Sequence, residues 1–103
     1  MVNNNAKNPA ASCPDVLVRE FVISNQYGIH ARPAAMLVKT ASRFQCDITF
    51  VKGNNKVSGK SIMGLMTLEA GFGAKLKVIA EGRDAEEALD ALQALFEQKF
   101  YEE

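Results

Sequence analysis

The sequence predicts an α+β domain, a two-layer sandwich in which three helices cover one face of a four-stranded antiparallel sheet. Three observations predict this fold. The hydrophobic pattern alternates between strand and helix periods in the order β-α-β-β-α-β-α. Two of the strands are neighbours across a tight turn, which requires antiparallel pairing. The chain has 103 residues, of which 48% are hydrophobic and 23% charged, and this composition suits one globular core.

The first part of the chain predicts an extension, a strand and a helix. Residues 1–15 are rich in Asn, Ala, Pro and Ser without hydrophobic periodicity, so we expect a flexible N-terminal extension ahead of a domain spanning 16–103. β-branched and aromatic residues predict a strand over Val16–Ser24. After a loop over Asn25–Gly28, apolar residues at helical spacing predict a helix over Ala31–Arg43. The apolar members of the strand are Val16, Val18, Phe21 and Ile23.

The central part predicts a hairpin and a short helix. Alternating apolar residues predict a half-buried strand over Gln45–Lys52, and Gly53–Asn55 is typical of a tight turn. A short strand over Lys56–Lys60 completes the hairpin. Ser61 is a good N-cap residue for a helix of one or two turns over Ile62–Met66.

The last part predicts a strand and the longest amphipathic helix. A loop over Ala70–Gly73 precedes a strand over Lys75–Glu81. We expect Asp84 to cap the final helix, with Glu87 completing a capping box three residues later. One apolar stripe then extends to the end of this helix and consists of Ala85, Ala88, Leu89, Leu92, Leu95, Phe96 and Phe100.

The charge balance argues against several classes of function. Lys and Arg together number 12, as do Asp and Glu, so the formal net charge is zero. A balanced chain without a Lys/Arg cluster or an aromatic RNA-binding strand argues against nucleic-acid binding, although RNA-binding modules also place helices on one face of a sheet. No apolar run approaches the roughly 20 residues that cross a bilayer. The N-terminus has no apolar segment typical of a secretory signal.

The cysteines and the single histidine give no metal-binding pattern. Cys13 and Cys46 lack the spacing of metal ligands, and His30 is the only histidine, so we expect neither a metal nor a cofactor. Both thiols are expected to be reduced in a cytoplasmic protein. The sequence also contains no glycine-rich loop of the kind that binds nucleotide phosphates.

His30 is the residue best suited to chemistry. An isolated histidine in a loop is more often a cap or a space-filling residue, but Pro33 can lie only in the first turn of a helix and so places His30 at the helix start. Unpaired backbone N–H groups and the positive end of the helix dipole favour an anion there. Arg32, in the same turn, adds a guanidinium group suited to phosphate oxygens. Since imidazole is a competent nucleophile near neutral pH, this combination favours a phosphohistidine site.

Ser61 and the apolar residues that follow it can be read as structural or as functional residues. The sequence alone supports Ser61 only as an N-cap. Ile62, Met63, Leu65 and Met66 are suited to the core, but a short helix cannot turn all of them inward, so we expect one or two to be exposed as an adaptable partner surface.

Two motifs carry a resemblance to a known family. The segment GIHARPAA, followed 31 residues after its histidine by the serine of KSIMGLM, closely resembles HPr, the histidine phosphocarrier family of the bacterial sugar phosphotransferase system. The resemblance extends over roughly Val16 to Phe100 and implies an open-faced β-sandwich. It also implies a cytoplasmic carrier, normally monomeric, without turnover of a small molecule of its own.

The resemblance assigns roles to individual residues. His30 matches the histidine that is phosphorylated at Nδ1 by enzyme I and passes the group to IIA-type proteins, and Arg32 matches the arginine that supports the phosphate. Ser61 matches the regulatory serine that HPr kinase/phosphorylase modifies in many lineages. Lys39 and, less closely, Arg43 match basic residues that meet acidic partner surfaces. The partner-facing apolar positions are matched by Ile62, Met63 and Met66.

One departure and one alternative remain open. Tyr27 occupies a place where sugar carriers of the family often have a small polar residue. A large apolar residue there is more familiar in nitrogen-branch, NPr-like relatives and in carriers outside the best-studied groups, so the resemblance leaves the pathway open. The alternative is a regulatory interaction protein of carbon or nitrogen control that acts through Ser61, with His30 secondary. Retention of His30 argues against Crh-like relatives, which lack this histidine.

Overall fold

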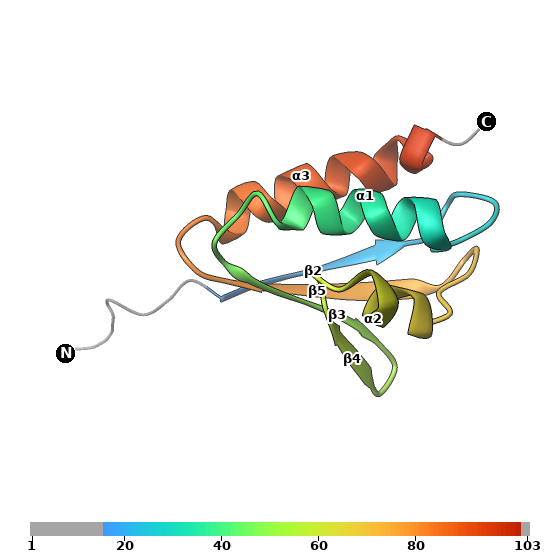
Figure 1. Cartoon of the computed structure of the whole chain (residues 1–103), viewed down its shortest axis with the longest axis horizontal. Coiled ribbons are helices and arrows are strands. Elements are labelled where there is room, and N and C mark those ends of the chain that lie inside the picture. The colour runs from blue at the N-terminus through green and yellow to red at the C-terminus, as the bar shows by residue number, and fades with distance from the viewer. Residues whose placement is uncertain (1–15, 102–103) are drawn as a thin grey trace.

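A computed structural model describes residues 16–101, so the expected N-terminal extension and Cys13 lie outside the described residues. The fold is the predicted β-α-β-β-α-β-α sandwich (Figure 1). Its elements are β2 (Val16–Val22), α1 (Ala31–Ala41), β3 (Asp47–Lys52), β4 (Asn55–Ser58), α2 (Ile62–Thr67), β5 (Lys75–Glu81), α3 (Ala85–Glu97) and the 3₁₀ turn η1 (Lys99–Tyr101).

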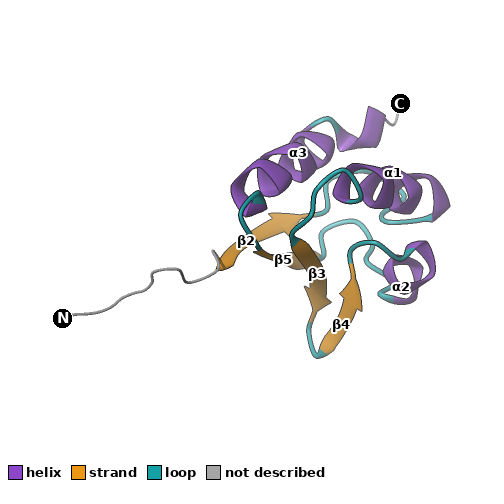
Figure 2. Cartoon of the chain, turned by 60° about the vertical axis from the view of Figure 1, so that its left-hand side comes forward, coloured by secondary structure: helices purple, strands orange, loops and turns teal. Residues whose placement is uncertain are grey.

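The four strands form one antiparallel sheet in the order β2-β5-β3-β4. The register places Val18 opposite Ile79, and Ile79 opposite Thr49. All three helices lie on one side of this sheet, as Figure 2 shows. α1 packs against both α2 and α3, while α3 covers β2 and β5. No helix in residues 16–101 is long and apolar enough to cross a membrane.

The core lies between the helices and the sheet. Alternate residues of the central strand β5 point inward, and Leu76, Val78 and Ala80 are fully buried. The same alternation turns Val16 and Val18 of the edge strand β2 toward solvent, on the face that no helix covers. These two valines therefore form part of the strand, as predicted, but not of the core.

The C-terminal helix is shorter than the apolar stripe predicts. α3 ends at Glu97, and Phe100 lies beyond it in η1 with a left-handed backbone (φ 55°). Phe100 is nevertheless 1% exposed and packs edge-to-face on Phe96, with ring centroids 5.1 Å apart. The prediction that Phe100 extends the helix is wrong, because a turn after α3 brings the ring back to the core instead.

The predicted capping box at α3 is also wrong. Asp84 occupies the N-cap position but makes no side-chain cap to its own helix. Its carboxylate accepts the backbone N–H groups of Gln45 and Cys46, both at 2.9 Å, ahead of β3. The N–H of Gln45, chiefly, lowers the pKa of Asp84 below its ordinary value. Burial, together with a hydrogen bond to Asp84, raises the pKa of the Cys46 thiol to about 11.

Candidate functional site

His30 lies where the sequence predicts, at the N-cap position of α1. Its backbone is extended (φ −101°, ψ −165°), and its carbonyl accepts the first helical hydrogen bond from the N–H of Ala34 at 2.9 Å. The imidazole does not cap the helix, and the residue is exposed. A partner can therefore reach the ring at the positive end of the α1 dipole.

The first turn of α1 leaves two backbone donors for an anion. Pro33 has no N–H, and the N–H of Ala34 is already used by His30. The N–H groups of Ala31 and Arg32 have no partner within a regular helix and point out of its N-terminus. Arg32 is exposed in the same turn. His30 and Arg32 therefore both lie exposed at the N-terminal end of α1.

The loop before α1 is held against a second loop. Gly28 has a left-handed backbone (φ +70°), and a Cβ there would come within 2.6 Å of the carbonyl oxygen of Ala70 and 2.7 Å of the Cα of Gly71. The N–H of Ile29 donates to the same carbonyl of Ala70 at 2.8 Å. Only glycine allows this approach, so Gly28 joins the histidine loop to the segment that follows α2.

Asn25 is a site residue that the sequence analysis missed. Its side chain is 1% exposed, and its Nδ2 donates to the carbonyl of Gly28 at 2.7 Å. That carbonyl also accepts the backbone N–H of His30 at 3.1 Å. Asn25 therefore supports the backbone position of His30 through the carbonyl group of Gly28. The available signal was an asparagine inside a predicted turn, a residue type that often bonds its own backbone.

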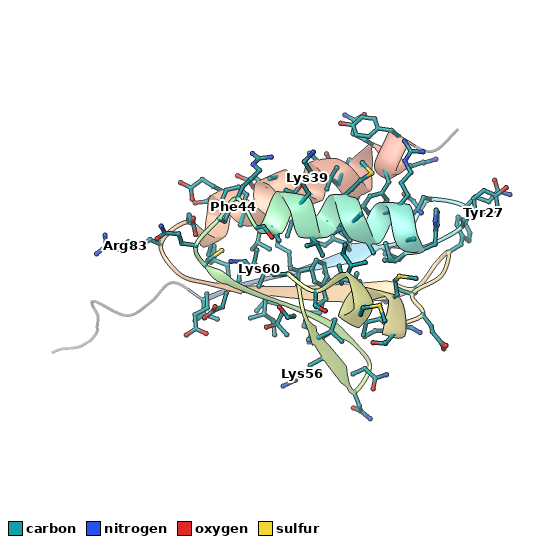
Figure 3. All side chains as sticks on the ribbon, in the orientation of Figure 1. Tyr27, Lys39, Phe44, Lys56, Lys60 and Arg83 are labelled. Carbon is teal, nitrogen blue, oxygen red and sulfur yellow. The ribbon has the colours of Figure 1, made fainter. Side chains whose placement is uncertain are left out.

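Tyr27 lies beside His30 at the exposed end of the domain. The two ring centroids are 6.3 Å apart with an interplanar angle of 81°, an edge-to-face arrangement. Tyr27 is 67% exposed. In Figure 3 it projects from the end of the molecule where α1 begins, opposite the end that carries Arg83.

α2 places Ser61 and an apolar surface next to α1. Ser61 is the predicted N-cap, and its Oγ accepts the N–H of Gly64 at 3.0 Å. The neighbouring Lys60 donates through Nζ to the carbonyl of Phe44 at 2.8 Å, which links the start of α2 to the loop that follows α1. A Cβ on Gly64 would lie 3.1 Å from the Cβ of Val57, so glycine lets α2 lie close to β4.

The apolar residues of α2 divide between core and surface. Leu65 is fully buried, whereas Met63 is 74% exposed. Ile62 and Met66 are also exposed, so these three residues form an apolar surface on α2. The expected exposure is present, and it involves three side chains rather than one or two.

Lys39 lies away from His30 along α1, whereas Phe72 lies in the loop that packs against Gly28. Lys39 is exposed on α1 (Figure 3), but nine residues beyond His30, roughly 13 Å along the helix. Phe72 is exposed in the loop that contacts Gly28. The sequence predicts only a loop over 70–73, in which Phe72 stands between two glycines.

The surroundings of His30 offer no metal site. In residues 16–101, no group of three or more His, Cys, Asp or Glu side chains is placed to hold a metal ion. What the site offers is a nucleophilic ring, two amides and a guanidinium group. This set suits transient covalent attachment of a phosphoryl group.

Comparison with known proteins agrees with this chemistry. The family model for the PTS HPr component phosphorylation site matches residues 17–98. The chain belongs to the HPr family. It is 44% identical over 88 residues to phosphocarrier protein HPr of Treponema pallidum, covering 85% of this chain and 100% of that protein. The crystal structure of HPr-C-His from Thermoanaerobacter tengcongensis superposes with a TM-score of 0.81 at 49% identity, covering 84% of this chain and 98% of that one.

Membership of the HPr family confirms the predicted fold and the predicted phosphoryl-carrier function. The chain is a phosphoryl carrier of the phosphotransferase system and is cytoplasmic, as predicted. Phosphocarrier protein NPr of Shewanella violacea is also 44% identical, over 86 residues that cover 84% of this chain and 94% of that protein. The HPr and NPr relatives are thus equally similar to this chain.

Proposed function

We propose that His30 is the residue that carries the phosphoryl group, accepting it from phospho-enzyme I and passing it to IIA-type proteins. The observation that carries this proposal is the exposed imidazole at the N-terminus of α1, next to the N–H groups of Ala31 and Arg32. His30 is also the only histidine of the chain.

The transfer needs nothing beyond this ring and a phosphorylated donor. A neutral ring nitrogen of His30 attacks phosphorus, and the bond between phosphorus and the donor group of phospho-enzyme I breaks as the new P–N bond forms. The donor group leaves with the bonding electron pair, the proton released from the other ring nitrogen of His30 balances its charge, and no atom is oxidised or reduced. The amides of Ala31 and Arg32 then hold the phosphoryl oxygens, an electrostatic role typical of helix N-termini.

Labelling with phosphoenolpyruvate tests the assignment. Incubation with enzyme I should add one phosphate to the wild-type chain, acid-labile and mapped to His30 by mass spectrometry. His30→Ala should abolish it, with an unchanged circular dichroism melt because the side chain is exposed and does not cap α1. A phosphate that persists on another residue of this variant contradicts the proposal.

Arg32 supports the phosphate in this proposal. Arg32→Lys keeps the charge but loses the fork of donors, so transfer should slow in both Arg32→Lys and Arg32→Ala, and more in the alanine variant. A charged hydrogen bond corresponds to about a tenfold to hundredfold change in rate. Rapid-quench kinetics measure this effect, and rates equal to those of the wild type in both variants would remove Arg32 from the site.

Ser61 supports a second, regulatory function. The observation that favours it is the position of Ser61 at the start of α2, immediately before the exposed side chains of Ile62 and Met63. A phosphate there adds about −1.5 to −2 charge beside an apolar partner surface. The added charge can weaken the binding of one partner and strengthen the binding of another. Backbone N–H groups at the start of α2 stabilise this negative charge.

ATP-dependent labelling tests the role of Ser61. With HPr kinase/phosphorylase and ATP, we expect one acid-stable phosphate at Ser61 and none in Ser61→Ala. The matched control is Ser42→Ala, an exposed serine at the end of α1, which should be labelled like the wild type. Failure to label the wild type with an active kinase counts against regulation through Ser61.

The partner surface consists of Ile62, Met63 and Met66 in this proposal, with Lys39 supplying charge toward acidic partners. We expect a monomer, which light scattering after gel filtration tests directly. Whether the carrier serves the carbon or the nitrogen branch is tested by comparing transfer from the enzyme I of each branch to this chain.

A further inference from the structure

We propose that Tyr27 is a positioning residue for His30, whose aromatic ring holds the imidazole in the orientation from which it accepts and donates a phosphoryl group. This inference rests on the proposed role of His30. It concerns a residue that stands where many sugar carriers have a small polar side chain, and it gives the aromatic ring a function within the transfer reaction.

The contact between the two rings is direct. Their centroids are 6.3 Å apart and their planes meet at 81°. This falls within the 4.5–7 Å range of edge-to-face aromatic pairs, in which the positive edge of one ring faces the negative face of the other. The contact is therefore directional and favours one relative orientation of the imidazole over others.

The backbone between the two residues keeps the rings together. Gly28 turns the chain with a left-handed φ of +70°, and the carbonyl of Gly28 accepts both the side chain of Asn25 and the N–H of His30. Gly28 also lies against the backbone of Gly71. Because this turn is held on both sides, Tyr27 stays beside His30 although the tyrosine itself is 67% exposed.

Orientation matters because the imidazole is on the surface. Exposed side chains change rotamer within picoseconds to nanoseconds. Phosphoryl transfer, by contrast, requires the reacting atoms to be aligned at about 3–3.5 Å. An aromatic ring on one side of the imidazole removes orientations that do not lead to transfer, so less ordering remains to be done when the partner docks.

Two substitutions separate the ring from the rest of the side chain. Tyr27→Phe keeps the ring, and Tyr27→Leu keeps apolar bulk without it. We expect Tyr27→Phe to transfer like the wild type. Tyr27→Leu should lower the maximal rate of transfer from phospho-enzyme I about two- to tenfold, the range that matches an aromatic pair, with KM unchanged.

Proton NMR of His30 measures the surroundings of the imidazole ring independently of the stability of the domain. His30 is the only histidine, so its two ring protons are assigned without ambiguity. Their chemical shifts should be alike in the wild type and Tyr27→Phe, and should move in Tyr27→Leu as the ring current is lost. The matched control is Tyr101→Leu, which removes a tyrosine that is 57% exposed in η1 and should change neither the rate nor the shifts.

The results are decisive in each direction. A maximal rate for Tyr27→Leu equal to that of the wild type overturns the inference. A change confined to KM also overturns it, because Tyr27 would then act in docking of the partner. So does a loss of maximal rate in Tyr27→Phe as large as in Tyr27→Leu, because the effect would then belong to the hydroxyl group. If the wild type is not labelled at His30 while the NMR shifts respond as expected, the proposed function fails and the ring contact stands.

Discussion

At the scale of single residues, the histidine loop combines the burial of Ile29 with a few short polar contacts. Asn25 is the clearest case, since a buried amide donates to the carbonyl of Gly28 at 2.7 Å and has no partner for its Oδ1 among residues 16–101. Its contribution is the placement of one carbonyl, which in turn holds the N–H of His30. A local contact of this kind controls the site without touching the phosphoryl group.

Substitution of Asn25 should reveal this support. Asn25→Ala loses one hydrogen bond and should lower the free energy of unfolding by about 0.5–1.5 kcal/mol. Asn25→Asp has the same shape, but its carboxylate cannot donate and would face the carbonyl oxygen of Gly28, so it should be the more destabilising of the two at pH 7. Urea denaturation measures both. Equal stability of Asn25→Asp and the wild type would show that this hydrogen bond is not needed.

At the scale of elements, charged side chains link segments that are distant in the sequence. Asp84 joins the start of α3 to the segment before β3 through the N–H groups of Gln45 and Cys46. Arg19 of β2 joins the same helix through an ion pair with Asp90 at 2.8 Å. Lys52 of β3 donates to the carbonyls of Leu68 and Glu69 at the end of α2, both at 3.2 Å. Helices that are too short to be stable alone are thereby held on the sheet.

Asp84 makes the stability of this link depend on pH. Its pKa is lower in the folded protein than the ordinary value of 3.8, so its contribution is fully present above that value and is lost as the pH falls through the lower, folded pKa. Asp84→Asn should be less stable than the wild type at pH 7. The difference between the two should shrink as the pH is lowered below 3.8.

Thermal melts between pH 7 and pH 2 check this expectation. Glu86→Gln is the matched control, because it removes an exposed carboxylate from the first turn of the same helix. The control should follow the wild-type dependence on pH. A constant difference between Asp84→Asn and the wild type over the whole range would contradict the role given to the Asp84 carboxylate.

At the scale of the whole molecule, the C-terminal turn closes the core. Lys99, Phe100 and Tyr101 all have positive φ angles, between 52° and 58°, which costs each non-glycine residue about 1–2 kcal/mol. Burial of Phe100 offsets this cost, because its ring packs on Phe96, which itself stacks on Phe21 of β2 at 4.6 Å. Three rings therefore connect the edge strand, α3 and the end of the described chain.

Phe100→Ala should therefore destabilise the whole domain. Loss of a fully buried phenylalanine costs about 3–5 kcal/mol, a large part of the stability of a small domain. Tyr101→Ala is the matched control, and since this side chain is mostly exposed its effect should stay within about 0.5 kcal/mol. Urea denaturation compares the two, and similar values would mean that η1 is not part of the core.

The sequence alone predicts the order of the elements, the buried faces of β5 and α3, and the place of His30. Those features follow from local geometry, because a period of 2 or 3.6 residues and the position of Pro33 are properties of short segments. The GIHARPAA and KSIMGLM motifs likewise contain their information locally. This is why the fold and the phosphocarrier family were both predicted.

Only the tertiary structure decided which polar groups meet. Asp84 lies at the start of α3, yet it binds amides 38 and 39 residues away, because the packing of α3 on the sheet brings the segment before β3 within reach. The contact of the Gly28 turn with Ala70 and Gly71, and with it the placing of Phe72, depends on the same long-range packing. A sequence pattern reports what a segment favours by itself, whereas the choice between a near and a distant partner depends on the free energy of the whole assembled core.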